Sequence, residues 1–273
     1  MQANKEVTSP VFQYFGGKWK LAPWILSFMP PHRTYVEPFG GGGSVLFRKP
    51  RSHCEVYNDL DSEVVNVFQV LRDSPKELLR VLDLTPYSRE EYYLACELYE
   101  GEDSIEKARR AIVRSFFGFG STGLFEGSRP GFRTGTQYSR VPVASVWGKY
   151  PDALLAVIDR LKGVTIEHRD ALEVMPVWDG FDTVYYLDPP YLADTRRAKQ
   201  IYRHEMTEAQ HISLLEAVQD LKGIVLISGY ASGLYDKMLT GWERYEKQAM
   251  AQGNSNSNDE MMRTEVLWIK RAK

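Results

Sequence analysis

Short runs of apolar residues alternate along much of the chain with segments in which apolar residues recur every three or four positions. Runs that are apolar at nearly every position are typical of parallel strands, because such strands are buried on both faces of a sheet. These runs predict strands at Thr34–Glu37, Cys54–Asn58, Val164–His168, Thr183–Leu187, Gly223–Ser228 and Thr264–Lys270. The segments of helical period predict helices at Lys18–Phe28, Ser44–Phe47, Asp61–Leu71, Pro151–Leu161 and Thr207–Leu221. Strands that alternate with helices predict an α/β fold built on a parallel sheet.

This alternation stops between about Asp73 and Tyr150, where helix-like segments are followed by a glycine-rich stretch. We therefore expect a discontinuous core, residues 1–72 joined to residues 151–273. Residues 73–150 would form an inserted domain that is mainly helical and rich in loops.

The composition places the chain among ordinary globular proteins. It has 273 residues, 43% hydrophobic and 26% charged, with two cysteines. These values exclude disordered, collagen-like and disulfide-framework classes. We find no apolar segment of membrane-spanning length and no signal peptide, so we expect a cytoplasmic protein. The histidines and cysteines lack metal-ligand spacing, and no metal site is expected.

The charge distribution singles out one window, residues 107–149, which carries +7 in a chain whose net charge is −2. The remainder therefore carries about −9. Its basic residues are Lys107, Arg109, Arg110, Arg114, Arg129, Arg133, Arg140 and Lys149. It also contains the aromatic residues Phe116, Phe117, Phe119, Phe125, Phe132, Tyr138 and Trp147. Basic and aromatic side chains together indicate a nucleic-acid-binding surface. Taken alone, the window fits a solvated charged face with buried aromatic residues better.

A glycine-rich turn follows the first predicted strand, in the segment Pro38-Phe39-Gly40-Gly41-Gly42-Gly43-Ser44. Glycines between a strand and a helix let the backbone approach a cofactor closely. Some 20 residues later Asp59 ends the second strand, where an α/β nucleoside site places the carboxylate that binds the ribose hydroxyls. Asp59 as the cap of the next helix is the alternative, although Asp61 could supply that cap.

The sharpest chemical signal is the tetrapeptide Asp188-Pro189-Pro190-Tyr191, directly after the apolar strand Thr183–Leu187. The Asp188 carboxylate and an exposed proline carbonyl are two acceptors beside the flat ring of Tyr191. Two acceptors that hold both hydrogens of a conjugated amine favour pyramidal geometry and direct its lone pair at an electrophile. A turn stiffened by proline is the alternative.

These motifs give the sequence its resemblance to the Dam-type, alpha-group DNA adenine methyltransferases. Four motifs match in the family's order: Tyr14-Phe15-Gly16-Gly17-Lys18, Glu37-Pro38-Phe39 with its glycines, Asn58-Asp59, and Asp188-Pro189-Pro190-Tyr191. Weaker matches are Arg169-Asp170-Ala171-Leu172 and the terminal Arg263-Thr264-Glu265-Val266-Leu267-Trp268, which resembles the phage and prophage branch.

The resemblance implies a Rossmann-like core that transfers a methyl group from S-adenosylmethionine to the exocyclic amine of a flipped adenine in double-stranded DNA. It implies cofactor binding by Tyr14, Gly16, Gly17, Lys18, Glu37, Pro38, Phe39, Gly41, Gly43, Ser44, Asp59 and Asp170. In this scheme Gly16, Gly17 and Lys18 contact the methionine part, Asp59 the ribose and Asp170 the adenine amine. The catalytic residues would be Asp188, Pro189, Pro190 and Tyr191.

The family's target recognition domain lies between the second and third core strands, at the place of the basic insert, and this favours DNA binding by the insert. The expected DNA contacts are Arg109, Arg110, Arg114, Arg129, Arg133, Arg140, Arg196, Arg197 and Lys199. Of these, we expect Arg129 or Arg133 to read a base, and Arg109, Arg110 or Arg114 to hold phosphate.

Two other classes of function compete with this interpretation. A methyltransferase for RNA or for a protein glutamine amide could use a similar tetrapeptide, but neither predicts the N-terminal Gly-Gly-Lys motif or an insert at this place. A DNA-binding protein on an inactive core would be expected to have lost Asp188 or Tyr191. We therefore expect an active, site-specific enzyme, monomeric in solution, of the kind found in restriction-modification systems.

Overall fold

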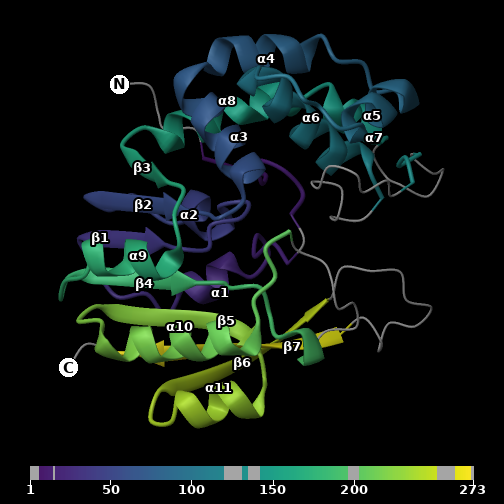
Figure 1. Ribbon diagram of the computed structural model, residues 1–273. Helices are drawn as coiled ribbons and strands as arrows, with labels where there is room; N and C mark the ends of the chain where they lie inside the picture. Colours follow the sequence, from purple (N-terminus) through teal and green to yellow (C-terminus); the bar gives the residue numbers. More distant parts are fainter. Residues whose placement is uncertain are drawn as a thin grey trace. The chain divides into compact units, whose positions relative to one another are not determined.

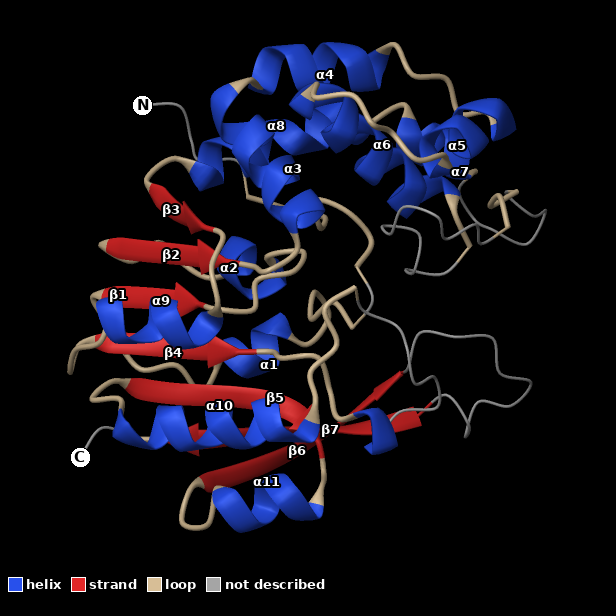
Figure 2. Ribbon diagram, in the orientation of Figure 1, coloured by secondary structure: helices blue, strands red, loops and turns tan. Residues whose placement is uncertain are grey.

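The computed structural model describes residues 6–14, 16–119, 131–134, 142–195, 203–250 and 262–271. The chain divides into two compact units. The sheet unit comprises Lys20–Gly40, Lys49–Asp61 and Gly163–Lys273, and the helical unit comprises Met1–Trp19, Gly41–Arg48 and Ser62–Lys162. Figure 2 shows the strands of the sheet unit in red and the helices in blue.

Within its described residues, the sheet unit contains one seven-stranded sheet of order β3-β2-β1-β4-β5-β7-β6. The strands are β1 (Thr34–Glu37), β2 (Cys54–Asn58), β3 (Val164–Glu167), β4 (Thr183–Leu187), β5 (Ile224–Tyr230), β6 (Glu243–Met250) and β7 (Met262–Lys270). The pairs from β3 to β5 are parallel, whereas β7 runs antiparallel to both β5 and β6. A parallel sheet whose order reverses beside its first strand is the Rossmann-like arrangement, so the predicted α/β fold class is confirmed.

Short helices complete the sheet unit: α1 (Ala22–Leu26), α9 (Ala171–Val177), the 3₁₀ turn η1 (Ala193–Thr195), α10 (Glu208–Asp220) and α11 (Gly233–Met238). Helices α9, α10 and α11 pack on one face of the sheet, where they share a core with alternate strand residues such as Val36, Tyr185 and Ile227 (Figure 1). The opposite face carries the other alternate residues, Tyr35 and Tyr186 among them, because successive strand side chains point to opposite sides.

The predicted strands agree with six of the seven observed strands to within two residues, and β6 was missed. Its sequence, Glu-Arg-Tyr-Glu-Lys-Gln-Ala-Met, has no apolar run because β6 lies at the edge of the sheet and most of it is exposed. Charged residues on an edge strand prevent further strand pairing. Helices α9 and α11 were also missed, since both are too short to show a helical period.

The helical unit contains α2 (Ser44–Arg48), α3 (Ser62–Asp73), α4 (Pro75–Asp83), α5 (Arg89–Cys96), α6 (Ser104–Phe117), α7 (Val143–Trp147) and α8 (Tyr150–Leu161). Helix α6 contacts α3, α4 and α5, and α8 contacts α3, α4 and α7. The two units have different bounds from the two domains predicted from the sequence, which were a core of residues 1–72 with 151–273 and an insert of residues 73–150. The reason is that α3 and α8, assigned to the core from sequence, pack with the helices of the insert.

A buried ion pair joins two helices of this unit. The guanidinium of Arg114, on α6, is fully buried and donates to Glu63 Oε1 on α3 and to the carbonyl of Ala95 on α5, each at 2.6 Å. Charges inside a protein are tolerated only when they are paired and hydrogen-bonded. One side chain of α6 thus holds two neighbouring helices.

Arg114→Ala should lower the free energy of unfolding by about 3–5 kcal/mol, because it leaves the Glu63 carboxylate without its buried partner. Urea unfolding followed by far-UV circular dichroism measures this loss. The matched control is Arg72→Ala, which removes an exposed pair with Asp73 at 2.6 Å and should change stability by no more than about 0.5 kcal/mol. Equal effects of the two substitutions would contradict the argument.

Candidate functional site

The carboxyl ends of the parallel strands carry the polar residues of the sheet unit. The chain proceeds from β1 to β2 and β3 on one side and then places β4 on the other side of β1. Ligands of open α/β sheets bind where the strand order reverses, outside the carboxyl ends. Glu37 ends β1 and Asp188 follows β4, the two strands that flank this point.

Asn58, at the end of β2, joins the segments that follow β1 and β3. Its Nδ2 donates to the carbonyls of Pro38 at 2.8 Å and Arg169 at 3.0 Å, and its Oδ1 accepts from the Arg169 amide at 3.0 Å. The side chain is buried, with 1% exposure. Only an amide can donate and accept in this way. Sequence analysis treated Asn58 merely as the neighbour of Asp59, whereas the structure shows that it orders three strand ends.

Asp59 directly follows Asn58, and Asp170 lies on the segment after β3 that Asn58 holds. Asp59 is half-buried, and its Oδ1 accepts from the amide of Asp61 at 2.8 Å, which closes a tight turn after β2. Asp170 is exposed and caps α9 by accepting from the Leu172 amide at 2.8 Å. Both predicted cofactor ligands therefore have a local structural bond at the carboxyl edge of the sheet.

Glu37 is buried, with 2% exposure, at the end of β1. The hydroxyl of Tyr35 donates to Glu37 Oε2 at 2.8 Å. Burial raises the pKa of Tyr35 well above its ordinary value, and the Glu37 carboxylate raises it further. A protonated tyrosine is a permanent donor, so this bond stabilises the negative charge of Glu37.

The tetrapeptide Asp188-Pro189-Pro190-Tyr191 is held by residues of β4, β5 and β7. Ser228 Oγ donates to Asp188 Oδ1 at 2.8 Å and lies 3.0 Å from the hydroxyl of Tyr186. Since a carboxylate only accepts, the single proton of Ser228 is directed to Asp188 and Tyr186 is the donor to Ser228. The hydroxyl of Tyr191 donates to Glu265 Oε2 at 2.7 Å. Sequence analysis missed Ser228 and Tyr186 as polar residues of the site, because they lie within apolar strand runs; Glu265 was named only in the weaker terminal match.

The helical unit contains seven further predicted cofactor residues, namely Tyr14, Gly16, Gly17, Lys18, Gly41, Gly43 and Ser44. Lys18 is buried and its Nζ donates to the carbonyl of Gly16 at 2.6 Å. A methyl group built on Gly17 would lie 3.8 Å from Ser44 Oγ, and one built on Gly41 would lie 2.9 Å from the ring of Tyr14. The Gly16–Lys18 loop and the glycine-rich turn are therefore neighbours within this unit.

Positive φ angles explain two glycines of that turn. Gly41 has φ +46° and Gly43 has φ +63°, values that side-chain-bearing residues rarely adopt. Gly43 also lies against Phe47, whose ring would be 2.5 Å from an added methyl group. The turn thus requires glycine for its conformation and not only for access to a ligand. Pro38 is buried and Phe39 half-buried, directly before the turn.

The three arginines of α6 do not face solvent. Arg109 contacts Glu91 at 2.8 Å and Glu106 at 2.6 Å, Arg110 contacts Glu106 at 2.7 Å, and Arg114 is fully buried as described above. Arg109 and Arg110 are 9% and 8% exposed. The structure thus contradicts the expectation that these three hold phosphate. Their charges are matched by carboxylates and carbonyls inside the helical unit.

The aromatic residues of the same window are also mostly internal. Phe116, Phe117 and Trp147 are buried, and Phe117 packs edge-on against Trp147 with ring centroids 4.7 Å apart. Among the described members only Phe119 is largely exposed, at 50%. The alternative interpretation, buried aromatic residues, is therefore correct for the helical part of the window.

The remaining basic candidates lie at or beyond the ends of the described segments. Arg129, Arg140, Arg196, Arg197 and Lys199 lie outside the described residues. Arg133 is half-buried, and its amide donates to the carbonyl of Phe117 at 2.6 Å. With the antiparallel bridge between Gly118 and Phe132, this bond closes the base of the segment that contains Arg129.

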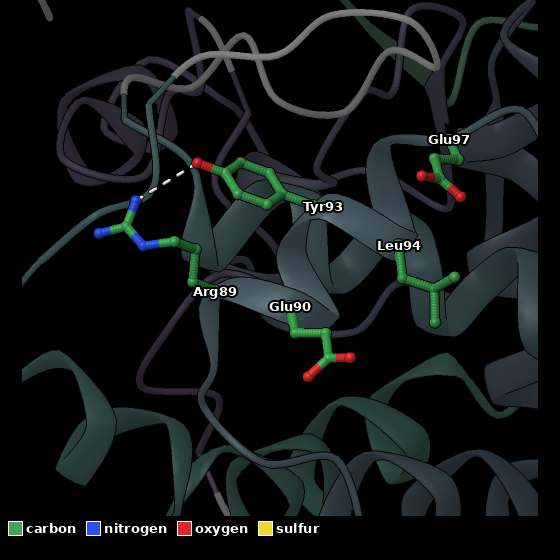
Figure 3. Close-up of a pocket in the computed structure, with 5 residues that line it drawn as sticks. All are labelled: Arg89, Glu90, Tyr93, Leu94 and Glu97. Carbon is green, nitrogen blue, oxygen red and sulfur yellow. Dashed lines mark hydrogen bonds between the residues drawn. The ribbon is translucent and has the colours of Figure 1, made fainter.

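A shallow pocket lies on the exposed face of α5 and is lined by Arg89, Glu90, Tyr93, Leu94 and Glu97 (Figure 3). Arg89 Nη1 points to the Tyr93 hydroxyl at 3.4 Å. Two carboxylates and one guanidinium give this face a net negative charge. It is therefore not complementary to DNA phosphates.

Within the described ranges, no helix is both long and apolar enough to span a bilayer. Those ranges also contain no group of three or more histidine, cysteine, aspartate or glutamate residues arranged to hold a metal ion.

Comparison with known proteins identifies similar sequences. The profile of the family described as "D12 class N6 adenine-specific DNA methyltransferase" matches residues 14–252. The type II methyltransferase M1.LlaDCHI of Lactococcus lactis subsp. cremoris is 26% identical, over 98% of this chain and 97% of the relative. The DNA N-6-adenine-methyltransferase of Escherichia phage P1 is 24% identical, over 68% of this chain and 24% of the phage protein. The type II methyltransferase M.MjaIII of Methanocaldococcus jannaschii is 22% identical, over 85% and 88%.

Asn58→Ala should lower the free energy of unfolding by about 2–4 kcal/mol, because three buried hydrogen bonds are lost at roughly 1 kcal/mol each and two carbonyls lose a donor. Urea unfolding measures the change. Asn66→Ala is the matched control, since Asn66 makes one exposed bond to the carbonyl of Ser104 at 2.9 Å. A loss no larger for Asn58→Ala than for Asn66→Ala would show that the strand ends do not depend on Asn58.

Proposed function

Because the chain belongs to the D12 class N6 adenine-specific DNA methyltransferases, we propose that it is a site-specific enzyme whose strand-end carboxylates bind S-adenosylmethionine and whose Asp188-Pro189-Pro190-Tyr191 segment performs the transfer. The enzyme transfers a methyl group to the N6 amine of adenine in DNA. The family resemblance and the activity predicted from the sequence are thus confirmed.

The observation that carries the proposal is that Asp188 and Tyr191 of the tetrapeptide are each fixed by a hydrogen bond to another strand. Ser228 donates to Asp188 at 2.8 Å, and Tyr191 donates to Glu265 at 2.7 Å. Active-site groups require this kind of fixed orientation, because misplaced acceptors do not select the reactive geometry of the substrate. A proline turn with only a structural role would not need a buried carboxylate partner for its tyrosine.

The charges and turns of the described residues fit S-adenosylmethionine as the methyl donor. Glu37, Asp59 and Asp170 supply carboxylates at the carboxyl edge of the sheet, for a cationic group, ribose hydroxyls and an adenine amine. In the helical unit, the Gly16–Lys18 loop and the turn at Gly41–Ser44 are proposed as cofactor contacts from the family resemblance alone. When bound, this cofactor supplies an electrophilic methyl group on a positively charged sulfur.

The tetrapeptide would act on a target adenine turned out of the duplex. Asp188 and the Pro189 carbonyl accept the two amine hydrogens, and the ring of Tyr191 stacks on the base. These two acceptors orient the nitrogen lone pair toward the methyl group. The nitrogen becomes positively charged and therefore acidic on attack, so its proton passes afterwards to Asp188 or to water, and no base is required beforehand.

The target sequence would be recognised by the segment of residues 73–150. Support comes from the closed base at Gly118 and Phe132, which brackets a stretch containing Arg129, and from the arginines of the window that lie outside α6. Arg129, Arg133 and Arg140 are proposed as DNA contacts there, and Arg196, Arg197 and Lys199 as phosphate contacts after the tetrapeptide. Arg109, Arg110 and Arg114 are excluded by their internal partners.

Asp188→Ala should lower the turnover number for adenine methylation on the order of 10²–10³-fold, because one of two acceptors of the amine is lost. Affinity for S-adenosylmethionine should change little. Tritium transfer from labelled S-adenosylmethionine into unmethylated genomic DNA, followed by base analysis, measures turnover and identifies the methylated base.

Asp59→Ala serves as the complementary variant, since it should weaken cofactor affinity and leave DNA affinity nearly unchanged. Label recovered only in cytosine, RNA or protein would refute the activity. Parallel loss of turnover and cofactor affinity in Asp188→Ala would refute the role given to Asp188.

Arg129→Ala should weaken binding of the target duplex by about 1–3 kcal/mol and hardly affect a scrambled duplex, if Arg129 reads a base. A phosphate contact would instead weaken both duplexes and flatten the log–log salt dependence by roughly 0.9. Fluorescence anisotropy across a salt series distinguishes the two cases. Arg244→Ala is the control, because Arg244 forms exposed pairs with Asp236 and Glu246. Unchanged affinity and salt slope for Arg129→Ala, Arg133→Ala and Arg140→Ala together would exclude the insert as the DNA-binding surface.

A further inference from the structure

Tyr191 is held at its hydroxyl end by a residue 74 positions away in the sequence. Its hydroxyl donates to Glu265 Oε2 at 2.7 Å, and both side chains are 8% exposed. Burying a carboxylate costs free energy unless strong hydrogen bonds compensate. A bond from the catalytic tetrapeptide to a carboxylate inside β7 is therefore a specific feature of the site.

The ring of Tyr191 is held by a second residue, Tyr230, which is the cross-strand partner of Glu265. Tyr230 on β5 and Glu265 on β7 are directly opposed in the antiparallel pair. Opposed residues project to the same face. The rings of Tyr191 and Tyr230 meet edge to face, with centroids 4.7 Å apart and an interplanar angle of 73°. This cross-strand pair thus contacts Tyr191 at two points: Tyr230 at the ring and Glu265 at the hydroxyl.

The two contacts restrict different motions of the side chain. An edge-to-face contact limits rotation of the ring about its own axis, while the hydroxyl bond limits movement of its far end. Burial raises the pKa of Tyr191 well above its ordinary value, and the carboxylates of Asp188 and Glu265 raise it further. The hydroxyl therefore stays protonated and remains a donor.

We infer that Glu265 is a positioning residue for methyl transfer, which anchors the Tyr191 hydroxyl so that the ring presents a fixed face to the target adenine. This inference rests on the proposed function of the tetrapeptide. Glu265 would act through Tyr191 alone, without touching the DNA or the cofactor.

The test is a set of variants in which the anchor is removed from either end. Glu265→Ala should lower kcat for adenine methylation about tenfold, the typical effect of losing one hydrogen bond to a charged group. S-adenosylmethionine affinity should stay within about twofold. Glu265→Gln should retain most of the activity, since its amide oxygen still accepts from the hydroxyl. Glu246→Ala on the exposed edge strand β6 is the matched control and should behave as the wild type.

Tyr191→Phe removes only the hydroxyl and should lower kcat by a similar factor. In that background Glu265→Ala should cause no further loss of kcat, because the hydroxyl that Glu265 anchors is already absent. If Glu265→Ala only damaged the fold, the loss of kcat in the double variant would be the product of the losses in the two single variants. Should Glu265→Ala fail to fold, Tyr191→Phe and Glu265→Gln still decide the matter.

Four results would overturn the inference: full activity of Glu265→Ala or of Tyr191→Phe, independent effects of the two substitutions, a loss in Glu265→Gln as large as in Glu265→Ala, or a parallel loss of cofactor affinity. Failure of the wild-type enzyme to methylate adenine would be different, since it would remove the proposed function itself. The wild-type assay therefore separates the two failures.

Discussion

The side-chain amide of Asn58 is the constraint on which the carboxyl edge of the sheet depends. It is buried, and it bonds the segments that follow β1 and β3 through Pro38 and Arg169. The backbone adds one bond at this edge, from the Gly40 amide to the Asn58 carbonyl at 2.8 Å. The Asn58 side chain extends the connection to the segment after β3, because an amide can both donate and accept. Asp59 directly follows Asn58 and Asp170 directly follows Arg169, so both carboxylates lie beside residues that these bonds fix.

The sheet face without α9, α10 and α11 carries paired hydroxyls and carboxylates. Tyr35 donates to Glu37, Ser228 to Asp188 and Tyr191 to Glu265. In two of the pairs the donor is a tyrosine whose pKa is raised by burial, so its hydroxyl stays protonated. Such pairs support negative charge beside an apolar sheet at lower cost than isolated carboxylates. The site is therefore acidic and pre-ordered, which suits a cationic cofactor and an amine substrate.

The helical unit uses the three arginines of α6 internally. Arg109, Arg110 and Arg114 connect α6 to α3, to α5 and to the turn after α5. A guanidinium makes several bonds in one plane and can satisfy carboxylates and helix-end carbonyls together. The net charge of a sequence window therefore overestimates what its surface offers to DNA. Three of the proposed DNA contacts, Arg129, Arg133 and Arg140, lie in the same sequence window but outside α6.

The sequence by itself determined the fold class, most of the strands and the motifs, because each depends on local order: apolar runs for buried strands, glycines for turns with positive φ, and the tetrapeptide after β4. Family and activity followed from those motifs. Only the tertiary structure decided which side chains support them. Ser228 and Glu265 lie 40 and 74 residues from their partners, and β6 is recognisable as a strand only through its pairing with β7. The α6 arginines are likewise buried and paired through carboxylates and carbonyls that include those of other elements. Burial and ion pairing depend on neighbours in space and leave no periodic signal in the chain.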